Sequence, residues 1–169
     1  SSTLPSSSAG LLANLYMPVL YPGDPAEALD LGRHAIALSR ASGLWAALKI
    51  VADVADGTAT VDLDPDRVTP LMPLVAGKRY AKRPEGRLLA PLSLELERDI
   101  IELRLPLALR YALENKLNRA VIDPAQAWIG IVASGITYRE VREAFEPLVG
   151  ERGVLRRRLD DALEQGLAA

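Results

Sequence analysis

The chain has 169 residues, which is enough for one domain or for parts of two, because domains usually run to about 100–150 residues. Hydrophobic residues make up 49% and charged residues 25% of the sequence, a composition that excludes an intrinsically disordered chain. The formal net charge of −2 gives no overall attraction to nucleic acid or an anionic membrane, and the lack of cysteine excludes disulfides, thiolate nucleophiles and iron–sulfur clusters held by this chain.

The first residues carry no targeting signal. Residues 1–8 are polar, without the basic and apolar regions of a signal peptide, and no apolar run approaches the roughly 20 residues needed to cross a bilayer. We therefore expect a cytoplasmic protein with no membrane or nucleic-acid partner. Because the sequence begins without methionine and in a polar run, we also expect it to be an internal piece of a longer protein.

The clearest local pattern is a strand followed by a helix. Residues 17–21 are a short apolar run stopped by Pro-Gly, as is typical of a buried strand. Asp24 then predicts a helix N-cap, Glu27 sits at the capping-box spacing, and Gly43 predicts the C-terminal stop. Small and apolar residues form a broad stripe along this helix, which favours packing on a sheet.

A second strand is expected over residues 46–54, closed by the turn residues Asp56 and Gly57, and a further short strand is expected over 58–63. Strand, helix and strand together predict a right-handed βαβ unit with parallel strands. The carboxyl ends of such strands are where open α/β sheets usually bind ligands.

Residues 64–91 contain five prolines and two glycines, which exclude any long regular element and predict a connector. Its basic run, residues 78–83, fits a solvated surface better than a phosphate site. An amphipathic helix is expected over 92–115, interrupted near Leu105 by Pro106. Residues 120–122 are expected to form a short strand.

A second strand–helix pattern begins near the C-terminal third of the chain. Residues 128–135 read as a strand, and Thr137 with Glu140 reads as a capping box for a helix over 138–145. The charged tail, residues 151–169, is expected to be helical. We therefore expect an α/β fold divided into residues 1–63, a connector with a kinked helix over 64–126, and the start of a second α/β domain over 127–169.

Few side chains have a spacing that indicates chemistry. His34 is the single histidine and lies within the first helix, so we expect it to be structural. Gly135 stands between a strand and a helix and could cradle a phosphate, but a plain tight turn is favoured. Asp53 and Asp56 close the second strand, where the sites of α/β proteins often lie, but Asp56 with Gly57 is also an ordinary turn signal. From the residues alone we therefore predict an α/β scaffold with no recognisable catalytic residue and no metal ligand.

A series of motifs runs in order along the chain to about Phe145: SSTLPSSS at 1–8, MPVLYPGD at 17–24, LDLGRHA at 29–35, ALSRASGLW at 37–45, LKIV at 48–51, VADG at 54–57, GRLL at 86–89, LELER at 94–98, LNR at 117–119 and IGIVASG at 129–135. In this order they closely resemble fused indolepyruvate ferredoxin oxidoreductases, thiamine-diphosphate enzymes of the 2-oxoacid:ferredoxin oxidoreductase family. Past Glu146 the sequence is less similar to the family.

The resemblance implies an enzyme that oxidatively decarboxylates an aryl 2-oxoacid such as indolepyruvate to its acyl-CoA, with ferredoxin as electron acceptor. It implies the cofactors thiamine diphosphate, Mg and 4Fe-4S clusters for the whole enzyme. The βαβ unit would be the C-terminal half of the pyrimidine-binding domain, with a partial parallel sheet and flanking helices. The partners would be the remainder of the oxidoreductase, ferredoxin and coenzyme A.

The family's cofactor-activating glutamate, its pyrophosphate and metal motif and its cluster cysteines all lie outside this chain. We therefore expect the chain to bind no cofactor alone and to be inactive alone. By position, residues 1–8 resemble the segment at the mouth of the active site, where the hydroxyls of Ser2, Thr3 and Ser6 could face a substrate carboxylate; a surface turn is an equally good interpretation.

Two other functions stay open. The chain could be a freestanding, non-catalytic α/β interaction module, which predicts a closed core and a stable monomer or homodimer. It could instead be a phosphate-binding or small-molecule-binding protein that uses Gly135 and the helix after it, which requires a concave pocket with convergent N–H donors. A piece of a larger enzyme predicts exposed apolar faces on the βαβ unit, because the rest of its sheet would be absent.

Overall fold

A computed structural model describes residues 7–82, 85–86, 89–125 and 127–149. The chain divides into two compact units, residues 1–130 and residues 131–169. The first unit is mixed α/β, with a small parallel sheet and several helices, so the expected α/β class is confirmed at this level. The finer division into residues 1–63, 64–126 and 127–169 stays a prediction.

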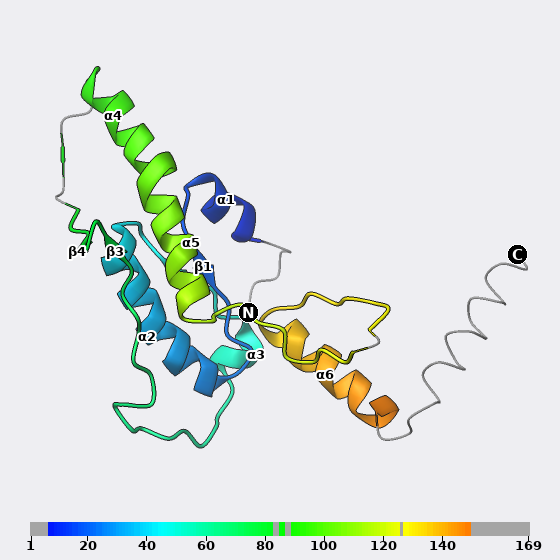
Figure 1. Cartoon of the computed structure of the whole chain (residues 1–169). Coiled ribbons are helices and arrows are strands. Elements are labelled where there is room, and N and C mark those ends of the chain that lie inside the picture. The colour runs from blue at the N-terminus through cyan, green and yellow to red at the C-terminus, as the bar shows by residue number, and fades with distance from the viewer. Residues whose placement is uncertain (1–6, 83–84, 87–88, 126, 150–169) are drawn as a thin grey trace, which may run out of the picture. The chain divides into compact units, whose positions relative to one another are not determined.

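The predicted βαβ unit is present in the first unit (Figure 1). Strand β1 (Val19–Leu20) pairs in parallel with β2 (Ala47–Leu48), and helix α2 (Pro25–Ser42) connects them. The ladder bonds run from Ala47 N to the Pro18 carbonyl at 2.8 Å and from Lys49 N to the Leu20 carbonyl at 2.9 Å. Each strand is only two residues long, so the sheet itself is minimal. A short helix, α1 (Ala9–Asn14), precedes β1 and buries no residue.

Helix α2 begins and ends where the sequence predicts. The Asp24 carboxylate accepts a hydrogen bond from Glu27 N at 2.7 Å, and Pro25 occupies the first turn, where its missing N–H costs nothing. The Glu27 carboxylate accepts from Gly23 N at 2.9 Å, one residue earlier than a standard capping box places it. Gly43 ends the helix in the left-handed conformation, with φ of +69°.

The predicted second strand, residues 46–54, is confirmed only at Ala47–Leu48. After β2 the chain turns into a one-turn helix, α3 (Ala52–Ala55), whose Val54 is buried. Residues 58–63 form no strand either. The apolar run was long enough for a strand, but a strand needs a neighbour to pair with, and the described part of the unit supplies only β1.

The connector contains a short β-hairpin that we did not predict, because its proline content argued against regular structure. Strands β3 (Leu74–Val75) and β4 (Lys78–Arg79) form an antiparallel hairpin. Its two turn residues, Ala76 and Gly77, have φ of +48° and +76°, as a two-residue hairpin turn requires. The remaining described residues of 64–91 hold no other helix or strand, in agreement with the prediction of a connector.

The predicted long helix exists and is interrupted by a π-helical segment. Helix α4 (Leu92–Asp99) continues through η1 (Ile100–Arg104) into α5 (Leu105–Glu114). Pro106 explains the interruption, because its ring crowds the preceding turn and it cannot donate a hydrogen bond to that turn. The wider π turn relieves this conflict without ending the helix, so α4, η1 and α5 form one continuous rod in Figure 1.

Packing of α2 against α5 makes the core of the first unit (Figure 1). Tyr111 is completely buried at this interface, and Ser42 is completely buried at the end of α2, where its hydroxyl donates to the Leu38 carbonyl at 2.9 Å. The buried apolar members of this cluster are Leu38, Ala41, Leu44, Ala108 and Tyr111. The core is therefore made mainly by two helices, with the sheet beside it.

The second strand–helix pattern is confirmed only for its helix. Helix α6 (Ile136–Val149) follows Gly135, whose φ is +61°. Thr137 lies inside this helix, so its predicted role as N-cap is wrong. Residues 120–122 and the described residues of 127–135 form no strand. The charged tail, residues 151–169, lies outside the described residues.

Within the described ranges no helix is both long and apolar enough to cross a membrane.

Substitution of Gly43 tests the end of α2. We expect Gly43→Ala to lower the free energy of unfolding by about 1–2 kcal/mol from the left-handed backbone alone. A Cβ atom there would also lie 2.6 Å from Lys82 Cβ, which adds to the loss. Gly10→Ala in α1 is the matched control, because a Cβ there meets nothing within 4 Å. Urea unfolding of both variants measures the difference, and equal stabilities would contradict the role assigned to Gly43.

Candidate functional site

The carboxyl edge of the parallel sheet is where a ligand was expected. Two side chains meet there, with Lys49 Nζ lying 4.5 Å from the centre of the Tyr21 ring, a cation–π contact worth about 0.5–1 kcal/mol at an exposed site. The nearby carboxylates of Asp24 and Glu27 accept backbone N–H groups at the start of α2. The acidic groups at this edge therefore stabilise the helix start.

Asp53 and Asp56 do not end a strand, contrary to the prediction. Asp53 lies in the single turn of α3 and Asp56 is the residue after it, and both are exposed. Gly57 closes the turn, where a Cβ would lie 2.8 Å from the Asp53 carbonyl oxygen. The turn interpretation of these residues thus fits the structure better than a binding site does.

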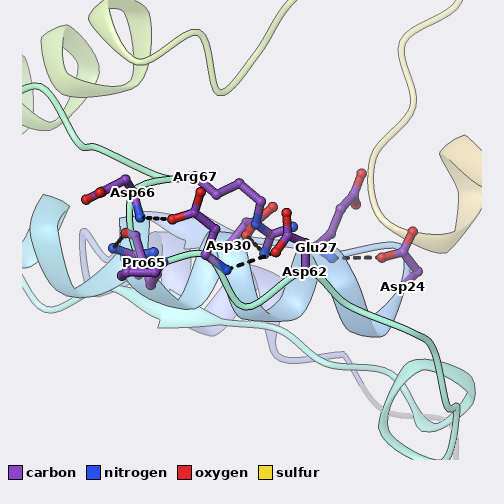
Figure 2. A network of polar contacts seen from close by, with 9 residues as sticks. Asp24, Glu27, Asp30, Asp62, Pro65, Asp66 and Arg67 are labelled. Atoms are coloured by element: carbon purple, nitrogen blue, oxygen red, sulfur yellow. Dashed lines mark hydrogen bonds and ion pairs between the residues drawn. The ribbon is translucent and has the colours of Figure 1, made fainter.

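A polar network joins α2 to the loop over residues 62–67 (Figure 2). Arg67 Nη2 lies 2.6 Å from Asp30 Oδ1, and Arg33 Nη2 donates to the Pro65 carbonyl at 2.7 Å. Both contacts are exposed to solvent, so each contributes at most about 1 kcal/mol. The network fixes where the loop lies on α2.

The aspartates of this loop bond to the loop's own backbone. Asp62 Oδ1 accepts from Asp64 N at 3.0 Å, and Asp64 Oδ1 accepts from Asp66 N at 2.8 Å. Such local bonds are what short acidic side chains make in turns. Although the acidic residues alternate along the sequence, they shape a loop, and no group of three potential metal ligands gathers among the described residues.

His34 lies in the packing between two helices, as expected of a structural histidine. Its Nδ1 is 2.9 Å from the Tyr111 hydroxyl of α5, and the two rings meet edge to face with centroids 6.0 Å apart. Burial raises the pKa of Tyr111 to about 12, so the hydroxyl stays protonated and can donate to neutral His34. Burial also lowers the pKa of His34, which Asp30 raises and Arg33 lowers to a smaller extent.

Part of the predicted basic run is used to hold helices. Lys82 Nζ lies 2.7 Å from Asp99 Oδ2, and the Tyr80 hydroxyl donates to the same oxygen at 3.2 Å. Burial raises the pKa of Tyr80, and the Asp99 charge adds to this effect. Arg104 donates to the carbonyls of Ser42 and Gly43, placing a cation at the negative end of α2. These residues fix α4 and η1 to the end of α2. Of the run 78–83, Lys78 and Arg79 are exposed as a solvated surface requires, whereas Arg83 lies outside the described residues.

The remaining candidates are not gathered into a site. Gly135 is buried before α6 in the left-handed conformation that a tight turn requires. The predicted hydroxyl group of Ser2, Thr3 and Ser6 lies outside the described residues, so its role stays a prediction. A phosphate cradle at Gly135 likewise stays a prediction.

Exposed apolar side chains surround the minimal sheet. Trp45, next to β2, is 76% exposed, and Ile50, just past β2, is 47% exposed. On β1, Val19 is 38% exposed while its neighbour Leu20 is buried, so one side of the strand is covered and the other is open. Parallel sheets are ordinarily covered on both faces. The strongest functional candidates are therefore these exposed apolar side chains around the sheet, which we refer to together as the sheet surface (Val19, Trp45 and Ile50).

Sequence reasoning missed the contact that holds the connector. Asn115, the residue after α5, donates from Nδ2 to the Leu71 carbonyl at 2.8 Å, and its Oδ1 accepts from Leu71 N at 2.7 Å. The amide thus pairs with Leu71 as a neighbouring strand would. An asparagine at a helix end is a usable signal, but its partner lies 44 residues away and leaves no local pattern.

The chain is mixed α/β, with an apolar surface beside a minimal parallel sheet as its candidate site. No protein-family model matches it, and no solved structure matches it. Among curated proteins it is similar to indolepyruvate oxidoreductase subunit IorA of Methanothermobacter thermautotrophicus, with 29% identity over 141 residues. The match covers 83% of this chain and 22% of that subunit, so the chain spans about a fifth of the relative's length.

The His34–Tyr111 pair predicts a pH dependence of stability. Because burial lowers the pKa of His34 below its ordinary value of about 6.5, the unfolded chain binds this proton first as the pH falls. The contribution of neutral His34 to the free energy of unfolding is fully present above about pH 6.5. It is lost progressively as the pH falls below that value, until His34 is protonated in the folded state too. Urea unfolding at pH 7.5 and 5.5 measures it. His34→Gln should reduce the difference, and an unchanged difference would contradict the assignment.

The sheet surface predicts a contrast between two adjacent residues. Leu44 is 4% exposed in the core, so Leu44→Ala should cost about 2–5 kcal/mol of stability. Trp45 is 76% exposed, so Trp45→Ser should change stability by less than about 0.5 kcal/mol while reducing self-association. Thermal unfolding and sedimentation velocity measure the two effects. A large loss of stability in Trp45→Ser would show that this surface is not open.

Proposed function

We propose that this chain is a scaffold portion of an oxidoreductase that oxidatively decarboxylates an aryl 2-oxoacid, indolepyruvate, to its acyl-CoA. Ferredoxin would accept the electrons, and the remainder of the same oxidoreductase would carry the catalytic groups. In this proposal the enzyme is cytoplasmic, and the chain alone is inactive.

The similarity to the IorA subunit carries the proposal. It extends over 83% of this chain, which makes it more informative than any single short motif. The chain corresponds to only 22% of that subunit, so a scaffold role within a larger enzyme fits the comparison better than a complete enzyme does.

The use of charged side chains in the structure agrees with a scaffold role. The carboxylates of Asp24 and Glu27 accept hydrogen bonds from backbone N–H groups at the start of α2. Two further contacts are ion pairs, Arg67 with Asp30 and Lys82 with Asp99. These groups already have structural partners, whereas catalytic groups need to be available to a substrate. The sheet surface agrees as well, because a piece of a larger sheet leaves apolar residues uncovered.

The proposed cofactors belong to the whole enzyme. Thiamine diphosphate needs a magnesium ion held by oxygen ligands, yet the described residues contain no group of three side chains able to hold a metal. A 4Fe-4S cluster needs cysteine thiolates, and the sequence has no cysteine. In this proposal both groups are held by the remainder of the enzyme, and we assign no reaction step to the described residues of this chain.

One observation favours a different function, a freestanding interaction module. The core between α2 and α5 is closed within the first unit, with Tyr111 completely buried. Such a core could fold without further chain. A module of this kind would be a stable monomer or homodimer that is indifferent to thiamine diphosphate.

Size and heat stability of the 169-residue chain, with and without thiamine diphosphate and magnesium, separate these functions. We expect the chain to self-associate. Its melting temperature should change by less than about 1 °C when the cofactors are added, because the chain alone should not bind them. A cofactor that did bind, at 100 times its Kd, would add about 2.7 kcal/mol of stability and raise the melting temperature by several degrees. The complete polypeptide from the reading frame, purified without oxygen, should reduce methyl viologen when given indolepyruvate and coenzyme A.

Two outcomes would contradict the proposal. A complete polypeptide that lacks indolepyruvate-dependent reduction, when loaded with its cofactors, would remove the assigned reaction. A tight, monodisperse chain encoded alone would favour the freestanding module. Pyruvate in place of indolepyruvate is the control for the substrate class.

A further inference from the structure

The outer side of the rod formed by α4, η1 and α5 is apolar. Its α4 and η1 parts bury no residue, and in Figure 1 α4 continues the rod beyond α5, the part that packs against α2. Four large apolar side chains of the rod are about half exposed or more: Leu94 60%, Ile101 48%, Leu109 62% and Leu113 65%. We call these four residues the outer stripe. A surface helix ordinarily carries polar residues on the side away from its core, so this surface is unusual.

The π-helical segment brings the outer stripe onto one face. Leu94 and Ile101 are seven residues apart, and Leu109 and Leu113 are four apart, so each pair lies on one side of a helix. Ile101 and Leu109 are eight residues apart, which in a straight α-helix would rotate one about 80° away from the other. The segment η1 lies in this interval and uses about one more residue per turn, so both pairs reach the same side.

The charged residues beside the outer stripe are arranged in a self-complementary order. Arg98 and Glu102 stand eight and four residues before Pro106. Arg110 and Glu114 stand four and eight residues after it. Turning a second rod end to end about this point sets Arg98 opposite Glu114, and it sets Glu102 opposite Arg110. A two-fold interface needs such an order, because each contact occurs twice with the two copies exchanged.

The ion pair already present on this side is compatible with a second partner. Arg110 Nε lies 2.6 Å from Glu114 Oε1 within the chain, and the Arg110 side chain is 54% exposed. A guanidinium has five N–H donors, so Arg110 can bind a second carboxylate without losing the first. The charges beside the outer stripe therefore favour another copy of the same rod.

We propose that the outer stripe is a homodimer interface, in which a second copy of this chain packs its rod antiparallel against the first. Leu94 of one copy lies near Leu113 of the other, and the two central members of the stripe lie near each other. A parallel pair would bring different flanks of the rods together and lose both ion pairs. The rod is only about 34 Å long, so the interface is small and the dimer is reversible. The interface is separate from the sheet surface and does not depend on the proposed reaction.

Cysteine cross-linking tests this arrangement, because the chain has no cysteine of its own. Leu94→Cys and Leu113→Cys are made as separate variants, both at exposed positions of the rod. A short bismaleimide should link the two variants when they are mixed. Each variant alone should give little linked dimer, because its two cysteines would lie about 28 Å apart. Leu63→Cys is the control, since Leu63 is 79% exposed in a loop, and it should link to neither variant.

Sedimentation velocity over a range of concentrations measures the strength of the dimer. Leu109→Lys should raise the dissociation constant at least about tenfold, because its ammonium group would be buried against apolar side chains of the second copy. Leu63→Lys is the matched control and should leave the constant unchanged. Glu102→Arg should also weaken the dimer, and adding Arg110→Glu should recover much of the loss, because the ion pair is restored with its signs exchanged.

Three outcomes would overturn the inference. A chain that stays monomeric at every concentration would show that the outer stripe is covered by something other than a second copy. Efficient linking of Leu94→Cys to itself would show that the rods are not antiparallel. Loss of the mixed cross-link when Trp45→Ser is added to both variants would assign the dimer to the sheet surface instead.

Discussion

The first unit depends on the contact between the Tyr111 side chain and α2. Tyr111 is completely buried, so its hydroxyl would be costly to leave without a partner, and His34 Nδ1 is that partner at 2.9 Å. The bond fixes how α5 lies along α2, and the remaining contacts follow from this alignment. Arg104 reaches the end of α2, and Asn115 reaches the connector. A sheet of two residues per strand could not hold these elements together alone.

Features that depend on neighbouring residues could be predicted from the sequence. The start of α2 at Asp24 and its end at Gly43 follow from local bonding and backbone freedom, and both are confirmed. The length of the second strand could not be predicted, because it depends on a partner elsewhere in space. The partners of Tyr111 and Asn115 lie 77 and 44 residues away and also leave no local signal.

In the candidate site, too, some features could be predicted from the sequence and others could not. Single side chains such as Asp53 and Asp56 could be noticed in the sequence, but whether they face a ligand depends on elements that the apolar run did not reveal. The sheet surface could be expected only as a consequence of an incomplete sheet. In the described residues, charged groups mostly hold helices and loops, while apolar groups remain exposed. Clusters of exposed apolar residues are typical of interaction surfaces.

The π-helical segment η1 sets the rotation of α4 about the helix axis relative to α5. On its N-terminal side Asp99 meets Lys82 and Tyr80, and on its C-terminal side Tyr111 meets α2. Each residue turns an α-helix by about 100°, so a one-residue change in the length of η1 would rotate α4 by roughly that angle relative to α5. Related sequences should therefore tolerate insertions and deletions in the connector far better than within Ile100–Arg104. The number of residues between Asp99 and Tyr111 should therefore be constant among related sequences and can be used to align them.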